Sequence, residues 1–154
     1  MRWLSGRIDR FSGWGYNANA PTDADSSAHA ILFLRHCGVE VPIQAYARLF
    51  SYLRPDGGFT TYLVPDPVDS WGISHPCVTP VALHAMLTCL PFDDPRLAPS
   101  LEYIRRGQTA TGTWHSFWWG SPLYGTAVNL EAAVELELEI DRKSLIESLE
   151  ALAP

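Results

Sequence analysis

Two aspartates stand directly before an apolar segment, in the run Asp23-Ala24-Asp25-Ser26-Ser27-Ala28. A carboxyl group buried beside a second carboxyl has a raised pKa, so it can stay protonated and act as an acid. Carboxylates at the start of a helix can instead accept backbone N–H bonds and cap the helix. Paired carboxylates can also bind magnesium together with a diphosphate group. From the residues alone, three roles of the two aspartates are therefore possible: a proton donor, a helix cap and a magnesium site.

Aromatic residues are the second group of candidates for a functional role, because the chain contains six Trp, six Tyr and six Phe. Many of the Trp residues stand in expected turns and loops. They could close the ends of helical hairpins, or they could line a cavity whose ring faces stabilise cationic or apolar ligands. The candidate residues for binding a ligand are Trp14, Tyr16, Phe59, Tyr62, Trp71, Trp114, Trp118, Trp119 and Tyr124.

Three turns that join glycine to an aromatic residue recur along the chain. They are Gly13-Trp14-Gly15-Tyr16, Gly57-Gly58-Phe59 and Gly112-Thr113-Trp114. Each is followed by a loop, a hydroxyl residue and an apolar run. From Gly13 to Gly58 is 45 residues and from Gly58 to Gly112 is 54. A two-helix repeat typically occupies roughly 40–50 residues. Such hairpins bury their apolar faces by stacking on one another.

The punctuation by glycine, proline and hydroxyl residues predicts a helix in each half of these repeats. Short, uniformly apolar segments alternate with amphipathic ones, which indicates an inner and an outer layer of helices. We expect one all-α domain over residues 1–154, an arc of about three helical hairpins. Asp93 or Asp94 is the expected cap of the fourth helix. The expected helices cover residues 26–36, 43–53, 78–90, 95–107, 124–138 and 141–153.

Composition and charge narrow the class of protein. The net charge is −6 and no basic cluster is present, so the sequence gives little support for nucleic-acid binding. No apolar run reaches the ~18 residues that a membrane span needs, and no signal peptide is recognised. Three cysteines in apolar surroundings favour free thiols in a reducing compartment. We expect a cytoplasmic protein, and peripheral association with a membrane stays open.

The segment Gln108-Thr109-Ala110-Thr111-Gly112-Thr113-Trp114 follows an amphipathic run. It resembles the QW repeat of squalene cyclases and related terpenoid cyclases. In that family the motif lies at the end of an outer helix and ties it to the next inner helix. The resemblance implies an αα-toroid, of which this chain would form about half of an (α/α)6 ring.

The aspartate run is similar to the Asp-x-Asp-Asp-Thr-Ala motif of class II terpene cyclases. Asp23 and Asp25 match the first and middle aspartates, and Ser26 replaces the third. The resemblance implies that Asp25 is the acid that protonates an alkene or an epoxide. It gives His75 two alternatives: it could orient Asp25 across the cavity, or it could cap a helix beside a proline.

Protein prenyltransferase β-subunits share this toroid and bind zinc through an Asp-x-Cys pair and a histidine at the next inner helix. Here His75-x-Cys77 falls near the pair, but Gly125 stands where the histidine is expected. A catalytic zinc usually has three protein ligands. We therefore expect no zinc. We expect no cofactor either, with magnesium and a diphosphate substrate as the alternative.

The resemblance implies a terpene cyclase of the isomerase or lyase type that acts on an isoprenoid chain. The alternative is a module without catalysis that binds an isoprenoid or another helical-repeat protein. An arc of three hairpins leaves apolar ends, which predicts a homodimer or a heterodimer with a similar chain. A monomer whose residues Met1 to Phe11 and Asp141 to Pro154 cover the ends is the competing expectation.

Overall fold

The computed structural model describes residues 13–63 and 70–152, and in these ranges the chain is all-α, as predicted. Besides the α-helices it contains one 3₁₀-helix, η1 (Ser70–Gly72), and two isolated β-bridges. The apolar, inner helices are α2 (Ala24–His36), α4 (Val78–Leu87) and α6 (Leu123–Glu135). The amphipathic, outer helices are α3 (Ile43–Phe50), α5 (Ala98–Arg106) and α7 (Arg142–Leu152).

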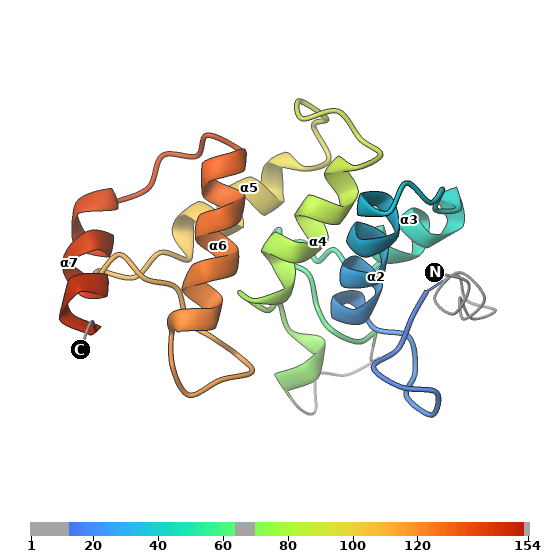
Figure 1. The fold of residues 1–154 in the computed structure, drawn as a ribbon, viewed down its shortest axis with the longest axis horizontal. Coiled ribbons are helices and arrows are strands. Elements are labelled where there is room, and N and C mark those ends of the chain that lie inside the picture. The colour runs from blue at the N-terminus through green and yellow to red at the C-terminus, as the bar shows by residue number, and fades with distance from the viewer. Residues whose placement is uncertain (1–12, 64–69, 153–154) are drawn as a thin grey trace.

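The inner helices lie side by side, α5 lies behind the seam between α4 and α6, and α7 lies beyond α6 at one end of the molecule (Figure 1). Helix α4 packs between α2 and α6, α3 packs on α2 and α4, and α5 packs on α4 and α6. Helix α7 has no comparable contact with any other described helix and docks on loops instead. The loop segments directly before the three inner helices lie at the lower edge of the molecule in Figure 1.

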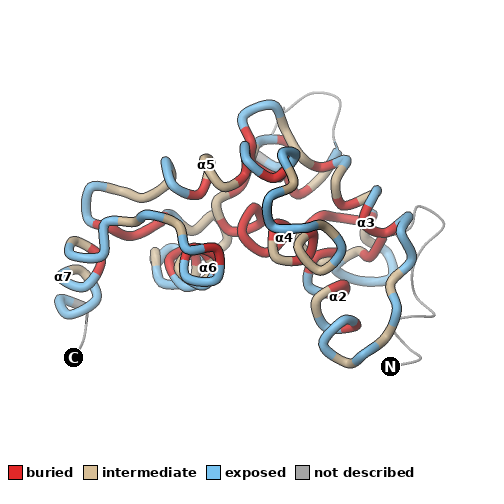
Figure 2. Tube along the Cα trace, turned by 90° about the horizontal axis from the view of Figure 1, so that it is seen from above, coloured by how far each residue is buried: buried red, intermediate tan, exposed pale blue. Residues whose placement is uncertain are grey.

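The core runs through the middle of the arc, and buried segments concentrate around α4 (Figure 2). Nearly every residue of α4 is buried, as expected for an inner helix with neighbours on both sides. Burial falls toward the two ends of the arc. Phe33 of α2 is 50% exposed and Val134 of α6 is 61% exposed. The ends of the arc therefore retain apolar surface.

Several helices are shorter than predicted. Helix α3 ends at Phe50 rather than Leu53, because Leu53 pairs with Phe59 in a β-bridge. Helix α4 ends at Leu87 rather than Leu90, in a turn closed by the bond from Leu90 N to Met86 O at 2.9 Å.

The C-terminal end of α6 also lies earlier than predicted, at Glu135 rather than Leu138. Glu137 has a φ of 49°, a left-handed backbone that cannot continue a right-handed helix. Residues 135–140 therefore form the end of a helix and the turn that follows it, and no strand lies in this segment.

The prediction that Asp93 or Asp94 caps the helix α5 is wrong. The helix begins at Ala98, and its N-cap, Leu97, makes no side-chain cap bond. Asp94 instead accepts hydrogen bonds from Arg96, through the backbone N–H at 3.0 Å and the guanidinium at 2.6 and 2.8 Å. The carboxylate therefore organises the turn before the helix.

One hydrogen bond recurs in all three repeats and fixes each turn to its inner helix. Ser27 Oγ accepts a bond from Trp14 N at 3.0 Å, and Thr126 Oγ1 accepts one from Trp114 N at 3.1 Å. In the middle repeat Thr79 Oγ1 accepts the bond from Phe59 N at 2.9 Å. These hydroxyl residues satisfy buried backbone donors that would otherwise be costly.

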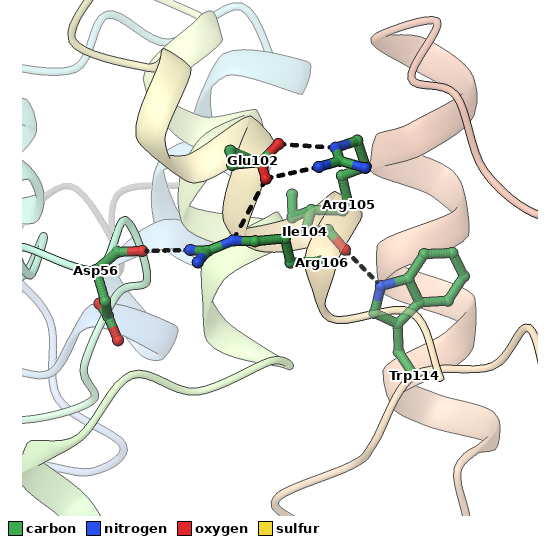
Figure 3. Close-up of polar contacts among 6 residues, drawn as sticks. All are labelled: Asp56, Glu102, Ile104, Arg105, Arg106 and Trp114. Atoms are coloured by element: carbon green, nitrogen blue, oxygen red, sulfur yellow. Dashed lines mark hydrogen bonds and ion pairs between the residues drawn. The ribbon is translucent and has the colours of Figure 1, made fainter. Parts of the chain in front are cut away.

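The segment that resembles a QW repeat ties α5 to both following helices. Gln108 Nε2 donates to Gly112 O at 2.8 Å, and Gln108 Oε1 accepts from Asp141 N at 2.8 Å, directly before α7. The Trp114 ring nitrogen donates to Ile104 O at 2.8 Å, in the last turns of α5 (Figure 3). The motif therefore holds the end of one outer helix against the start of the next.

Two glycine turns make the same kind of connection between outer helices. Gly57 has a φ of 90° and lies so close to Pro99 that an added Cβ would meet its carbonyl oxygen at 2.1 Å. Gly112 has a φ of 78° and would meet Leu145 N at 2.2 Å. Arg106 reinforces the first turn by donating to Asp56 O at 3.2 Å (Figure 3). Only glycine permits both the left-handed backbone and the close approach.

Candidate functional site

The two aspartates before α2 have different surroundings. Asp23 is the N-cap of α2: its Oδ1 accepts from Ser26 N at 2.6 Å. Its Oδ2 accepts from Tyr16 N at 3.1 Å, which ties the preceding loop to the helix. Burial raises the pKa of Asp23, and these hydrogen bonds oppose the rise. The capping alternative therefore applies to Asp23.

Asp25 lies in the first turn of α2 and is not a cap. Its Oδ1 is buried and has no hydrogen-bond partner in the described part of the chain. Burial raises the pKa of Asp25 above its ordinary value of 3.8; the nearby His29 opposes this rise and the carboxylate of Asp23 adds to it. A carboxyl group with few hydrogen bonds in a place of low polarity favours its protonated form.

The aspartates border a cavity of about 530 Å³ at the edge where the aromatic loops gather. Its lining is largely aromatic, and no lysine or arginine belongs to the described residues that form it. The cavity therefore suits an uncharged, apolar ligand close to the carboxyl group of Asp25. The lining residues are Tyr16, Ala20, Asp23, Asp25, Ser26, Thr61, Tyr62, Trp71, Trp118, Trp119 and Tyr124.

The aromatic wall is held together by contacts between loops from different repeats. The ring of Trp71 in η1 lies 5.7 Å from Tyr62 and 5.1 Å from Trp118, measured between ring centroids. Trp119 and Tyr124 make a further edge contact at 6.4 Å. Burial, and after it the nearby carboxylate of Asp25, raises the pKa of Tyr124 to about 12, so this hydroxyl stays protonated.

Three of the predicted ligand-binding aromatics lie elsewhere. Trp14, Phe59 and Trp114 follow the glycine turns and are buried in the core, at 6%, 0% and 0% exposure. None of them belongs to the described lining of the cavity. Their position follows from the recurring hydroxyl bond, which draws the backbone of each aromatic residue onto an inner helix.

His75 and Cys77 do not belong to the described lining of the cavity. His75 is fully buried, with its ring centroid 3.9 Å from that of Phe117. It stacks at 6.2 Å on Trp118, whose other neighbours include Trp71 in the cavity wall. The Cys77 sulfur accepts a hydrogen bond from Phe117 N at 3.1 Å. Burial raises the pKa of the Cys77 thiol, so this sulfur stays protonated and ties a loop to α4.

Two residues that the sequence analysis did not single out lie beside the acid. His29 follows Asp25 by one helical turn, with its Nε2 at 3.8 Å from Asp25 Oδ1. The i, i+4 spacing on a helix was the available signal. Thr61 is 2% exposed and lines the cavity. Its backbone carbonyl accepts a hydrogen bond from Ala24 N at 3.0 Å. No pattern in the sequence places this loop residue there.

Within residues 13–63 and 70–152 there is no group of three or more His, Cys, Asp or Glu residues that could hold a metal ion. In the same ranges every helix is too short or too polar to cross a bilayer.

Solved structures of terpene cyclases resemble this fold. The type II terpene cyclase MstE from Scytonema is 30% identical over 87% of this chain, with a TM-score of 0.71. A protein from Actinoplanes is 25% identical over 86% of the chain, with a TM-score of 0.73. The ent-copalyl diphosphate synthase from Streptomyces platensis, at 22% identity and a TM-score of 0.68, shares the fold. No model of a known protein family matches the chain, and no curated protein matches it in sequence.

The match covers only part of each of these proteins. The chain spans 41% of MstE, 42% of the Actinoplanes protein and 25% of the ent-copalyl diphosphate synthase. One structure of an MstE variant contains geranylgeranyl dihydroxybenzoate, which is named there as the substrate. This chain is thus similar to a section of a type II terpene cyclase.

Proposed function

We propose that this chain supplies the acid and part of the aromatic wall of a class II terpene cyclase, with Asp25 as the proton donor. The observation that carries the proposal is the contrast between the two aspartates. Both carboxylate oxygens of Asp23 accept hydrogen bonds from backbone N–H groups. Asp25 keeps a buried oxygen that has no hydrogen-bond partner among the described residues, with His29 at 3.8 Å, beside an aromatic cavity.

The proposed reaction begins when Asp25 protonates a terminal alkene of an isoprenoid chain. The O–H bond of the acid breaks, a C–H bond forms, and the positive charge moves to the more substituted carbon. The π electrons of the next double bond attack this carbon and close a ring. Loss of a proton from the last cation gives a cyclic isomer of the substrate.

The aromatic wall would stabilise the cations formed in this sequence. Tyr62, Trp71 and Trp118 are mutually packed and line the cavity together. A cation over the face of such a ring gains ~0.5–2 kcal/mol, more where water is excluded. The acid replaces a metal in this mechanism, so a chelator should leave turnover unchanged.

The chain would complete its cavity with a second, similar chain. It spans less than half of MstE, and apolar residues remain exposed at both ends of the arc. We therefore propose assembly with a second copy or a related helical-repeat chain. The isoprenoid would lie between the aromatic loops of the two.

The alternative is an isoprenoid-binding module without catalysis. It is favoured by one observation: Ser26 stands where the cyclase motif carries its third aspartate, which removes a charge that would further raise the pKa of Asp25. Both functions use the same cavity, and they differ only in whether a proton is transferred.

Incubation of the purified chain with geranylgeranyl dihydroxybenzoate, polyprenyl diphosphates and squalene, followed by mass spectrometry and chromatography, tests the proposal. A product with the substrate's mass and a changed retention time is expected from the wild type. Asp25→Asn should reduce its rate by ~10²–10⁴-fold, the usual cost of losing a general acid. Asp93→Asn, an exposed aspartate in the loop before α5, is the control. If the wild type binds the isoprenoid but forms no product, the alternative of a binding module without catalysis is supported. If Asp25→Asn turns over as fast as the wild type, Asp25 is not the proton donor.

A further inference from the structure

The inner helices follow one packing rule that stops at the ends of the arc. Helix α4 packs against α2 on one side and α6 on the other. Among the described helices, nothing packs on the next side of α6 or on the preceding side of α2. At each end of the arc, α2 or α6 therefore has one face without a neighbouring inner helix, whereas the corresponding face of α4 is covered.

The recurring hydroxyl bonds give the register between these helices. Ser27 and Thr126 are each the fourth residue of a helix of 13 residues, and Thr79 makes the same bond in α4. Alignment on these hydroxyls places Pro80, His84 and Leu87 of α4 in the positions of Ala127, Glu131 and Val134 of α6.

On α4 this stripe faces α6. His84 Nε2 lies 2.9 Å from Glu135 Oε2 of α6, and Pro80, one turn earlier, is buried. On α6 the equivalent residues Ala127, Glu131 and Val134 are all exposed. The face of α6 that would receive the next inner helix is thus bare.

The face of α2 that points away from α4 completes the comparison. Helix α6 meets α4 at Glu135, which pairs with His84. Val128 and Ala132 share the face of Glu135; Ala132 is 0% exposed and Val128 packs against the core. In the hydroxyl register their equivalents on α2 are three exposed residues, His29, Phe33 and His36.

The charges of the two bare faces are complementary. Inside the chain a histidine of the earlier helix, His84, meets a glutamate of the later one, Glu135. At the bare faces Glu131 of α6 stands in the position of His84, and His36 of α2 stands in the position of Glu135. A histidine–glutamate pair can therefore form there too, with the two residue types exchanged. Phe33 would cover Ala127 and Val134, which removes exposed apolar surface from both faces.

We propose that α2 of a second copy packs on α6 as α6 packs on α4, with Glu131 facing His36 of the second copy. The reciprocal contact closes two arcs into a ring with twofold symmetry. This proposal rests on the assembly part of the proposed function. It names the second copy as the partner and the two helix faces as the interface.

The interface bears on the acid. His29 belongs to the face that α6 of the second copy covers, and it lies 3.8 Å from Asp25. Assembly therefore places the N-terminal end of a second α6, with its aromatic loop, next to the carboxyl group. The acid of each chain is then enclosed by residues from both copies.

Complementation between two variants tests this arrangement. Ala127→Arg damages the face of α6, and Phe33→Arg damages the face of α2. Each variant alone damages both contacts of the ring, so we expect light scattering to give the single-chain mass of 17.1 kDa. A mixture of the two restores one intact contact and should give a dimer. Asp93→Arg, in the middle of the arc, is the control that stays dimeric.

The dissociation constant gives the second readout. Each single variant should raise it at least about tenfold, which corresponds to about 1.4 kcal/mol. Glu131→Lys should weaken the dimer, and adding His36→Glu in the same chain should recover it. Circular dichroism of each variant must match the wild type. A wild type that is monomeric at micromolar concentration, unchanged dimers in both Arg variants, or a mixture that stays monomeric would each overturn the interface. Turnover plays no part in this test, so its failure is separate from failure of the acid.

Discussion

Thr126→Val isolates the hydrogen bond that recurs between each aromatic turn and its inner helix. The substitution keeps the side-chain volume and removes the acceptor of Trp114 N, which lies at 3.1 Å. Thr126 is 3% exposed and Trp114 is fully buried, so water cannot replace the lost partner. A buried donor without a partner costs ~1–3 kcal/mol, and we expect a loss of about 2 kcal/mol in the free energy of unfolding.

Urea denaturation followed by circular dichroism at a fixed protein concentration measures this loss. For a chain of this size it also corresponds to a fall in Tm of about 4–8 °C. Thr126→Ser is the matched control, because Ser27 performs the same task in the first repeat, and it should cost clearly less than the valine variant. A loss below about 0.5 kcal/mol in Thr126→Val, or equal losses in both variants, would refute the assigned role of the hydroxyl.

Three further predictions concern the turn before α7, the acid and the thiols. Gln108→Ala removes the contacts of Gln108 with Gly112 and Asp141, so amide exchange should quicken over residues 142–152 but not in α2. The pKa of Asp25 is raised in the folded state, so its stabilising contribution is complete below the unfolded value of 3.8 and is lost as pH rises through the folded value. Asp25→Asn should therefore raise Tm at pH 7 relative to the wild type, with the gain shrinking toward pH 3.8; a gain that does not depend on pH would contradict this. Burial raises the pKa of both Cys77 and Cys89, but Cys77 is buried and Cys89 is exposed, so a thiol reagent followed by mass spectrometry should modify Cys89 before Cys77, and equal rates would count against the structure.

The helices could be predicted from the sequence because their signals are local. Apolar runs and their flanking glycine and proline residues identify each helix. Their ends were predicted less well, because contacts between distant residues decide them. Helix α3 stops where Leu53 pairs with Phe59, and no property of Leu53 alone announces that bridge.

The site could be predicted in part. The spacing of the two aspartates pointed to the start of α2. Only the structure distinguishes Asp23, which caps the helix, from Asp25, whose buried oxygen accepts no hydrogen bond from the described residues. The aromatic residues divide in the same way. Aromatic residues that directly follow a glycine turn, such as Trp114, lie in the core, where their backbone N–H donates to a hydroxyl of an inner helix. Those later in the loop, such as Trp118, line the cavity. The recurrence of hydroxyl residues was visible in the sequence, but its meaning depends on a bond across the fold.

The most direct test of proton donation by Asp25 is the reaction in D2O. The purified chain and an isoprenoid substrate are incubated in D2O. The product is then extracted and washed with ordinary water, which removes exchangeable deuterium, and its mass is measured by mass spectrometry. Proton donation from a carboxyl group that exchanges with solvent predicts one deuterium bound to carbon in each cyclised molecule, and Asp25→Asn should give almost no product. A cyclised product without deuterium, or full turnover by Asp25→Asn, would contradict the proposed mechanism.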